Sequence, residues 1–285
     1  MNADLAPLRA VTEDEVRRFW RDGVVCLRAI MPAAWLDVAA EGVERYLGSD
    51  RAFSLSAFGA DGPPRTGRRP RAHFYGGTDH WRTDEACRRF ACESPLPGIA
   101  GQLLRASRIN LYEDSILVKE PGATDKTAFH QDLSYFHVEG DQVCTAWIPL
   151  DPVRRDTGAL QFVQGSHMWR RLYRPNYFVT TEAMPDTEGE QAPDFHADRR
   201  DAEILCFDTE PGDITVHHAL TLHGADGNHS ASVRRRAVSV RYCGDDARYR
   251  LRRGAPRKPH HETVTPGAVL DHPDCPVVWR AQGAG

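Results

Sequence analysis

A histidine and an aspartate stand two positions apart in the run Phe129-His130-Gln131-Asp132, between a turn and a strand-like segment. In an extended chain, residues i and i+2 point to the same side, so His130 and Asp132 can face one ion. Two histidines and one carboxylate on one face of Fe(II) leave three open positions, which oxygenases use. The motif therefore predicts an iron site that needs a second histidine from elsewhere in the chain.

The second histidine is expected at position 223, in Leu222-His223-Gly224, where the glycine allows close approach of the backbone. This segment follows the turn Pro211-Gly212-Asp213 and a strand-like run. Three other histidines compete for the role, namely His217, His218 and His229. The predicted metal ligands and catalytic residues are His130, Asp132 and His223.

An arginine cluster follows the distal histidine at positions 234, 235 and 236 and leads into the strand-like run 237–242. A buried arginine near iron offers a fork to the distal carboxylate of 2-oxoglutarate, whose keto-acid end chelates the metal. By strand alternation, Arg235 shares a face with Ala237 and Ser239, small residues that suit a crowded interior. Arg235 is therefore the predicted partner of the cosubstrate, with Arg234 kept as the alternative.

The elements that must hold these residues change character along the chain. Four helices are expected over 13–21, 32–47, 82–92 and 94–106; the first has a capping box of Thr12 and Glu15 and ends at Gly23. From residue 108, short β-type runs separated by Gly- and Pro-containing turns predict strands at 116–118, 143–150, 160–163, 204–207, 214–216 and 237–242. Helices followed by many short strands favour a jelly roll over a doubly wound sheet.

Composition limits the class of protein. The 285 residues are 41% hydrophobic and 27% charged, with a net charge of −4, which is ordinary for a globular chain. Nothing suggests nucleic acid or a membrane as a partner, and a small-molecule substrate is expected; no pattern sets an oligomeric state. Seven scattered cysteines do not form a disulfide framework, and no signal peptide is recognised, so a cytoplasmic setting is expected.

The motifs together resemble the phytanoyl-CoA dioxygenase family of Fe(II)- and 2-oxoglutarate-dependent oxygenases. The resemblance covers roughly residues 12–245. It is carried in order by the following segments: 130–132 (HQD), 145–151 (TAWIPLD), 158–161 (GALQ), 165–167 (GSH), 211–213 (PGD), 223–224 (HG) and 235–237 (RRA).

The resemblance implies a fold and a site. The fold is mainly β with helical additions, and its core at about 108–245 is a double-stranded β-helix of the jelly-roll, cupin-like kind. A helical part at about 1–107 precedes the core and an extension at 246–285 follows it. All three parts form a single domain. The cofactor is Fe(II), and 2-oxoglutarate and O₂ are cosubstrates. Lys119, Thr145 and Trp147 are placed near 2-oxoglutarate, with core packing as the alternative for Trp147. Independently of the resemblance, Tyr135 and Phe136 follow the His-x-Asp motif and are expected to contact the substrate, with strand packing as their alternative.

Two departures from the family pattern stand out. Ala225 occupies a position where members often carry serine. The segment between His223 and the arginines is one residue longer than expected, so Arg234 remains the alternative partner of 2-oxoglutarate. The presence of Asp132, where related halogenases have glycine or alanine, argues against halogenation.

The expected function is hydroxylation of an unactivated C–H bond in a small organic substrate, such as a secondary metabolite, an amino acid or a lipid-like acid, with release of succinate and CO₂. The same iron chemistry with desaturation, epimerisation or cyclisation is one alternative. A non-catalytic β-barrel that binds a small molecule is another, and a Zn or Mn cupin is a third.

Three further segments carry expectations. Residues 50–80 and 171–200 are candidate lids that exclude water from the site. One loop contains a cluster of four arginines, which we interpret mainly as a solvated basic surface: Arg65, Arg68, Arg69 and Arg71. His260 and His261, adjacent on what we read as extended chain, are expected to face solvent rather than to form a metal pair.

Overall fold

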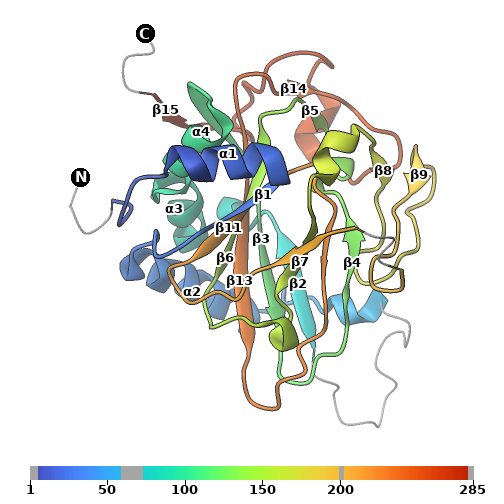
Figure 1. The fold of residues 1–285 in the computed structure, drawn as a ribbon. Coiled ribbons are helices and arrows are strands. Elements are labelled where there is room, and N and C mark those ends of the chain that lie inside the picture. The colour runs from blue at the N-terminus through green and yellow to red at the C-terminus, as the bar shows by residue number, and fades with distance from the viewer. Residues whose placement is uncertain (1–5, 59–72, 199–201, 282–285) are drawn as a thin grey trace.

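The computed structural model describes residues 6–58, 73–198 and 202–281. The arginines expected on a basic loop, Arg65, Arg68, Arg69 and Arg71, lie outside the described residues, as does much of the first candidate lid. Helices gather on one side of the molecule and strands on the other (Figure 1). No helix among the described residues is both long enough and apolar enough to span a membrane.

Four α-helices cover one face of the larger sheet. They are α1 (Glu13–Asp22), α2 (Ala33–Leu47), α3 (Glu85–Glu93) and α4 (Leu96–Leu104). The α1 capping box is present, with Thr12 and Glu15 bonded to each other's backbone amides, and the helix ends at Gly23 with φ +79°. Apolar side chains of the helices pack with those of the larger sheet in one core cluster. The helical part of the chain is therefore a cover that stabilises the sheet from outside.

Two antiparallel sheets form the double-stranded β-helix, which confirms the predicted fold class. In the described part of the chain, the larger sheet has the order β1-β11-β6-β13-β3-β15, with β2 also pairing β3. Its strands are β1 (Val24–Leu27), β2 (Phe74–Thr78), β3 (Arg108–Lys119), β6 (Val143–Pro149), β11 (Ile214–His218), β13 (Arg235–Cys243) and β15 (Val277–Arg280). The smaller sheet has the order β10-β7-β12-β4, made of β4 (Thr127–His130), β7 (Leu160–Val163), β10 (Ile204–Cys206) and β12 (His223–Ala225).

Two short strand pairs lie outside these sheets. β5 (Val138–Glu139) pairs with β14 (Arg248–Tyr249), and β8 (Tyr173–Arg174) pairs in parallel with β9 (Glu190–Gln191). The first pair joins the C-terminal extension to the segment that follows the His-x-Asp motif. The second gives the long polar segment 171–198 some structure of its own.

The regions before and after the β core contribute strands that the sequence did not predict. The N-terminal part, expected to be helical, supplies β1 and β2 to the larger sheet, and the C-terminal extension supplies β15. The expectation that His260 and His261 face solvent is wrong: they are 4% and 1% exposed. They lie in a 3₁₀ turn, Pro259–Glu262, rather than in extended chain, and the extension folds back over them.

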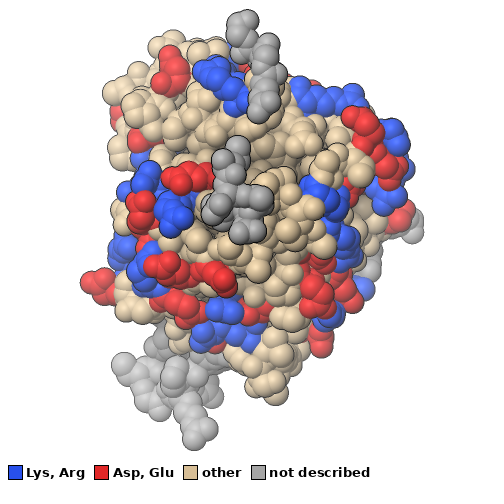
Figure 2. All heavy atoms as spheres, turned by 90° about the vertical axis from the view of Figure 1, so that its left-hand side faces the viewer, with Lys and Arg blue, Asp and Glu red and all other residues tan. Residues whose placement is uncertain are grey.

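The surface mixes charges of both signs. In the view of Figure 2, acidic and basic side chains are interspersed rather than gathered into a patch of one sign. This agrees with a net charge of only −4. Among the described residues no two cysteines form a disulfide.

Candidate metal centre

Strand pairing in the smaller sheet brings the two proposed histidine ligands together. His130 at the end of β4 and His223 at the start of β12 are Cα partners in the antiparallel register. Their imidazole centroids are 4.3 Å apart. Gln131 keeps an extended backbone, with φ −114° and ψ 132°, so Asp132 points to the same side as His130.

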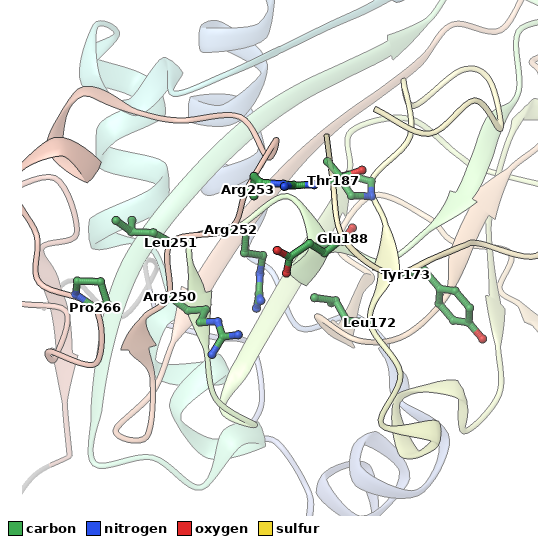
Figure 3. A pocket seen from close by; sticks show the side chains of 11 residues that line it. Leu172, Tyr173, Thr187, Glu188, Arg250, Leu251, Arg252, Arg253 and Pro266 are labelled. Carbon is green, nitrogen blue, oxygen red and sulfur yellow. The ribbon is translucent and has the colours of Figure 1, made fainter. Parts of the chain in front are cut away.

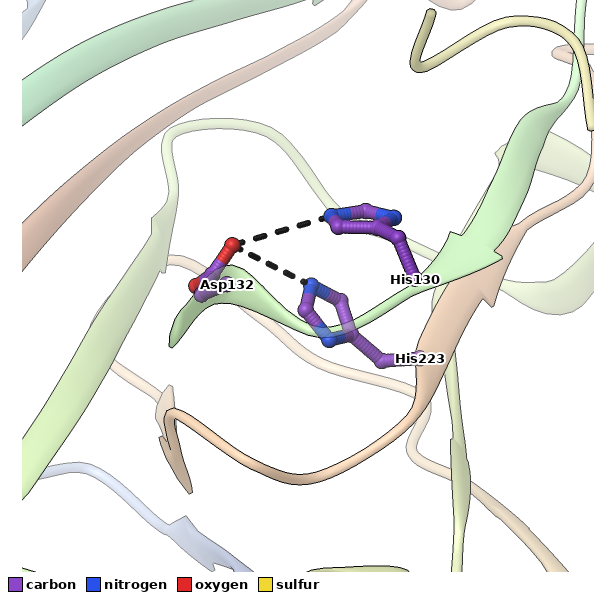
Figure 4. A group of neighbouring side chains, drawn as sticks. All are labelled: His130, Asp132 and His223. Carbon is purple, nitrogen blue, oxygen red and sulfur yellow. Dashed lines mark ion pairs between the residues drawn. The ribbon is translucent and has the colours of Figure 1, made fainter. Parts of the chain in front are cut away.

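The three side chains converge on one point in the barrel interior (Figure 4). Asp132 Oδ1 lies 3.6 Å from His130 Nε2 and 3.8 Å from His223 Nε2. All three residues are buried, and among the described residues their ligand atoms form one of two groups with metal-ligand spacing. The separations suit atoms that bind a common ion at about 2 Å, rather than atoms bonded to one another.

Backbone carbonyls set the tautomer of both imidazoles. His130 Nδ1 donates to the Ala128 carbonyl at 2.8 Å, and His223 Nδ1 donates to the Thr221 carbonyl at 3.0 Å. With the proton on Nδ1, each Nε2 carries a lone pair directed at the shared point. Burial, and then the neighbouring His130 and His217, hold the pKa of His223 well below its ordinary value, so its imidazole is neutral.

The outer oxygen of Asp132 is held by two side chains. Thr145 Oγ1 donates a short hydrogen bond to Oδ2, and His217 Nε2 lies 3.2 Å from the same atom. Burial alone would raise the pKa of Asp132, but hydrogen bonding, including that from His217, holds it well below its usual range. The carboxylate is therefore ionised and fixed, with Oδ1 left free.

His217, one competitor for the ligand position, contacts Asp132 rather than the shared point. Burial lowers its pKa, so it is neutral, and its Nε2–H donates to the carboxylate. His218 faces the α1 side, with its ring 6.0 Å from that of Trp20, and His229 is exposed. Neither lies in the group formed by His130, Asp132 and His223.

Arg235 reaches the same interior from the larger sheet. It is 1% exposed, and its guanidinium carbon lies 5.8 Å and 5.9 Å from the ring centroids of Trp147 and Phe74. Its only hydrogen bond among the described residues is a long one, 3.4 Å from Nη1 to the Leu117 carbonyl, and Nε has no partner. Burial lowers the pKa of Arg235 to about 10, so the cation persists at neutral pH. A buried cation with unused donors fits a ligand carboxylate.

The alternative arginine, Arg234, lies at the surface. It pairs with Glu120 at 3.0 Å and with Glu44 at 3.8 Å. Arg234 immediately precedes β13, and adjacent residues of an extended chain face opposite sides, so the two side chains diverge. Of these two arginines, Arg235 alone lines the narrow inner chamber beside the histidines, together with Thr145 and Trp147.

Lys119 is buried next to Arg235 on the neighbouring strand, but its ammonium is directed elsewhere. It donates to the Asp226 carbonyl at 2.6 Å and lies 4.6 Å from the ring of Phe74, which lines the inner chamber. Burial, and then Arg235, hold the pKa of Lys119 well below its ordinary value. Lys119 therefore supports the wall of the chamber without forming part of its lining.

Tyr135 and Phe136 line an outer chamber of about 300 Å³ that opens on the other side of His130 and Asp132. They follow the 3₁₀ turn Asp132–Ser134 and do not lie in a strand, so strand packing is not what holds them. The Tyr135 hydroxyl donates to Asn176 of the candidate lid at 171–198. The same lid places Phe178 between the two chambers, 5.0 Å from the His130 ring and in the left-handed region at φ +68°.

A third hollow of about 370 Å³ lies between the lid and the C-terminal extension (Figure 3). Arg252 and Arg253 line it, but their donors are used on backbone carbonyls: Arg252 bonds those of Phe136 and Val138, and Arg253 bonds that of Asp186. These arginines therefore tie the extension to the lid and to the segment beside the metal centre.

Sequence reasoning missed several residues of this site. Phe178 carries no recognisable signal. Gln131, noted only as the middle residue of the 130–132 motif, is buried and bonds the backbone of Arg171, Tyr173 and Leu220. Arg241 lines both the inner and the outer chamber. The alternation that selects Arg235 also selects Arg241, six residues further on the same strand.

Comparison with known proteins identifies the family. A family model described as phytanoyl-CoA dioxygenase matches residues 19–237, most of the chain. The chain therefore belongs to the phytanoyl-CoA dioxygenase family, which confirms the resemblance drawn from the motifs.

Curated relatives are similar over part of their length. A probable phytanoyl-CoA dioxygenase of Caenorhabditis elegans is 30% identical over 43% of this chain and 38% of its own. A probable alpha-ketoglutarate-dependent hypophosphite dioxygenase of Stutzerimonas stutzeri is 32% identical over 49% of this chain and 46% of its own. The matches thus span less than half the length of these relatives.

Among solved structures, the non-heme alpha-ketoglutarate-dependent carbocyclase SnoK from nogalamycin biosynthesis is similar throughout. It superposes with a TM-score of 0.73 at 23% identity, covering 96% of this chain and 99% of that one. At this identity the likeness establishes the shared fold.

Proposed function

We propose that this protein is an Fe(II)- and 2-oxoglutarate-dependent dioxygenase that hydroxylates an unactivated C–H bond of a small organic substrate. The single observation that carries the proposal is the pairing, across one narrow chamber, of a two-histidine, one-carboxylate group with the unsatisfied buried guanidinium of Arg235. Bound iron and 2-oxoglutarate would supply the oxidising power for C–H cleavage, with succinate and CO₂ as coproducts.

The chain's own residues perform the positioning. His130 and His223 would hold the iron through Nε2 atoms whose direction is fixed by the Nδ1–H bonds, and Asp132 would hold it through Oδ1. Arg235 would receive the distal carboxylate of 2-oxoglutarate, since a bidentate fork matches a carboxylate. Trp147 and Phe74 beside Arg235 exclude water, which strengthens the charge pairing.

The outer chamber is the proposed substrate site. Tyr135 and Phe136 line it, and His130 and Asp132 form its iron-facing side. A substrate held there presents its C–H bond to the metal centre from the side opposite Arg235. Lys119, Thr145 and Trp147 act as supports of the cosubstrate side, Thr145 through Asp132 and Lys119 through the chamber wall.

The test is the visible spectrum of purified, anaerobic protein with Fe(II) and 2-oxoglutarate. We expect a weak metal-to-ligand charge-transfer band from the bidentate keto acid, present in the wild type and in the exposed-site control His229→Gln, and absent in His130→Ala. Product analysis with a turned-over substrate then separates hydroxylation from desaturation, epimerisation and cyclisation. Absence of the band in the wild type at saturating iron and cosubstrate would contradict the oxygenase proposal and favour a non-catalytic β-barrel that binds a small molecule.

A further inference from the structure

Both apolar and charged side chains line the outer chamber. Aromatic and proline side chains form much of its wall, among them Tyr112, Phe136, Phe178 and Pro256. The C-terminal extension closes it with Pro256, Arg257 and Lys258. A ligand of about the chamber's 300 Å³ would therefore be mostly apolar, and its polar groups must match the charges that remain.

Lys258 is already neutralised. Its ammonium lies 2.8 Å from Asp79 Oδ1 and 2.9 Å from Glu113 Oε2, and 5.0 Å from the ring of Tyr112. Two carboxylates on one buried ammonium leave no demand for a further anion. Arg257 is half exposed and pairs with Glu262 at 3.4 Å.

Arg241 is the chamber's under-partnered cation. It is 7% exposed, and Nη1 donates to Ser115 Oγ. Glu113 lies 3.8 Å away, too far for a hydrogen bond, and within the described ranges Nε has no partner at all. A guanidinium has five donors, so most of its capacity is unused in a place where unsatisfied buried charge is costly.

Strand alternation places Arg241 at the junction of the two chambers. It shares the inward face of β13 with Arg235 and Ser239, and it lines both the inner and the outer chamber. A group bound to Arg241 from the outer side would lie beside the metal centre, with the rest of the molecule against the aromatic wall. One guanidinium with unused donors, whose nearest carboxylate, Glu113, is also bonded to Lys258, matches a singly charged carboxylate better than a doubly charged phosphate.

We propose that the substrate is an apolar organic acid whose carboxylate binds the guanidinium of Arg241 in the outer chamber. The proposal rests on the proposed function and names the substrate class of that site. Arg241 is then a specificity-determining residue, because the neutral ester or amide of the same acid offers no charged acceptor to the unused donors of this buried cation.

The experiment is a ligand-binding measurement independent of turnover. The full-length protein is loaded with Mn(II) and 2-oxoglutarate, and the ¹⁹F line widths of 4-fluorophenylacetate and 4-fluorobenzoate are compared with those of their methyl esters. Paramagnetic Mn(II) broadens the signal of a ligand held near the metal. The variants are Arg241→Gln, Arg241→Lys and, as a matched control that lines the same chamber, Arg257→Gln.

We expect the wild type and Arg257→Gln to broaden at least one acid about tenfold more than its ester, which corresponds to one lost charged hydrogen bond. In Arg241→Gln the acid should behave as the ester does, and Arg241→Lys, which keeps the charge, should retain part of the preference. The affinity for 2-oxoglutarate, measured from the Fe(II) charge-transfer band, should be unchanged in all three variants. Circular dichroism checks that each variant folds.

Two outcomes would overturn the proposal. One is broadening of acid and ester alike, or of neither, in the wild type. The other is weaker 2-oxoglutarate binding in Arg241→Gln with the acid preference intact, which would assign Arg241 to the cosubstrate. Absence of the charge-transfer band in the wild type, with acid-selective broadening retained, would instead contradict the oxygenase assignment and leave the anion site standing.

Discussion

At the scale of single residues, the two imidazoles of the metal centre are oriented by the backbone and the carboxylate by side chains. His130 and His223 each donate Nδ1–H to the carbonyl two residues earlier. Asp132 depends on Thr145 and His217 instead. We therefore expect substitutions around the Asp132 carboxylate to change the affinity for iron.

Thr145→Val removes the hydroxyl that holds Asp132 Oδ2 and keeps the side-chain volume. Because partners that orient a ligand typically contribute 10- to 100-fold in metal affinity, we expect Fe(II) to bind about 10-fold more weakly or worse. Thr145→Ser restores the hydroxyl and should recover most of the affinity. Titration of metal-free protein with Fe(II) against a chelator measures the change; equal affinities for the valine and serine variants would contradict this role.

Arg235→Gln removes the cation that we propose binds the distal carboxylate of 2-oxoglutarate. A charged hydrogen bond contributes about 1.5–3 kcal/mol, so the Kd for 2-oxoglutarate should rise by about 10- to 100-fold. Arg234→Gln is the matched control, one residue away and paired at the surface. The charge-transfer band gives both constants, and an effect of Arg234→Gln as large as that of Arg235→Gln would reverse the assignment.

Local periodicity predicted which residues of the candidate site share one face of an extended chain. It failed where the backbone is not extended. The spacing of His130 and Asp132 and the alternation that separates Arg235 from Arg234 depend only on an extended chain. The same rule applied to His260 and His261 gave the wrong answer, because a 3₁₀ turn and a folded-back extension bury both rings. The contact of Phe178 with the His130 ring joins residues 48 positions apart, which no local pattern encodes.

At the scale of elements, the helices and several strands were predictable, but β3 was predicted only at 116–118, and β4 and β12 were not predicted. β7 coincides with its prediction at 160–163, and β6 and β13 differ from theirs by one or two residues. β1, β2 and β15 were missed because four or five residues, two of them glycines in β2, carry too little periodicity. These strands form by pairing with strands already in place, which is a tertiary effect.

Gly23 joins α1 to β1 and combines two constraints. Its φ of +79° disfavours other residues, and a Cβ there would meet Thr221 Oγ1 at 2.4 Å and His167 Nδ1 at 2.6 Å. Gly267 has a similar φ of +84° with nothing within 4 Å. Gly267→Ala should therefore cost about 1–2 kcal/mol for conformation alone, and Gly23→Ala about 2–5 kcal/mol because overpacking adds to it.

Urea unfolding of both glycine variants measures the free energy of unfolding. The difference between them isolates the steric contribution at the junction whose Thr221 carbonyl also orients His223. Equal losses in the two variants would mean that the helix end relaxes without disturbing the metal side.

At the scale of the whole molecule, the C-terminal extension completes the site. Its Lys258 and Pro256 close the outer chamber, and β15 anchors its end on β3. The extension packs through a group of buried imidazoles, in which the His261 ring lies 4.4 Å from that of His137 and 4.2 Å from that of His260. Acidity should therefore affect the stability of this region and, with it, the closure of the chamber.

The histidines of the extension predict a loss of stability in mild acid. Burial, then neighbouring His260, His137 and Lys258, lowers the pKa of His261 to about 3, and burial lowers that of His260 to about 4. In the unfolded chain both imidazoles titrate near 6.5. Between about pH 6.5 and pH 4 the unfolded state therefore binds more protons, so the free energy of unfolding falls as the pH falls, whereas above pH 7 this contribution is constant.

His261→Gln removes one of these titrating groups, so the midpoint of urea unfolding should fall less between pH 7 and pH 5 than in the wild type. The change with pH is the readout, because the substitution can also alter stability at pH 7 by disturbing the bond from the Lys258 amide to His261 Nδ1. His229→Gln, at an exposed position, should keep the wild-type change. If His261→Gln and His229→Gln lose stability equally on acidification, protonation of His261 does not contribute to the acid sensitivity.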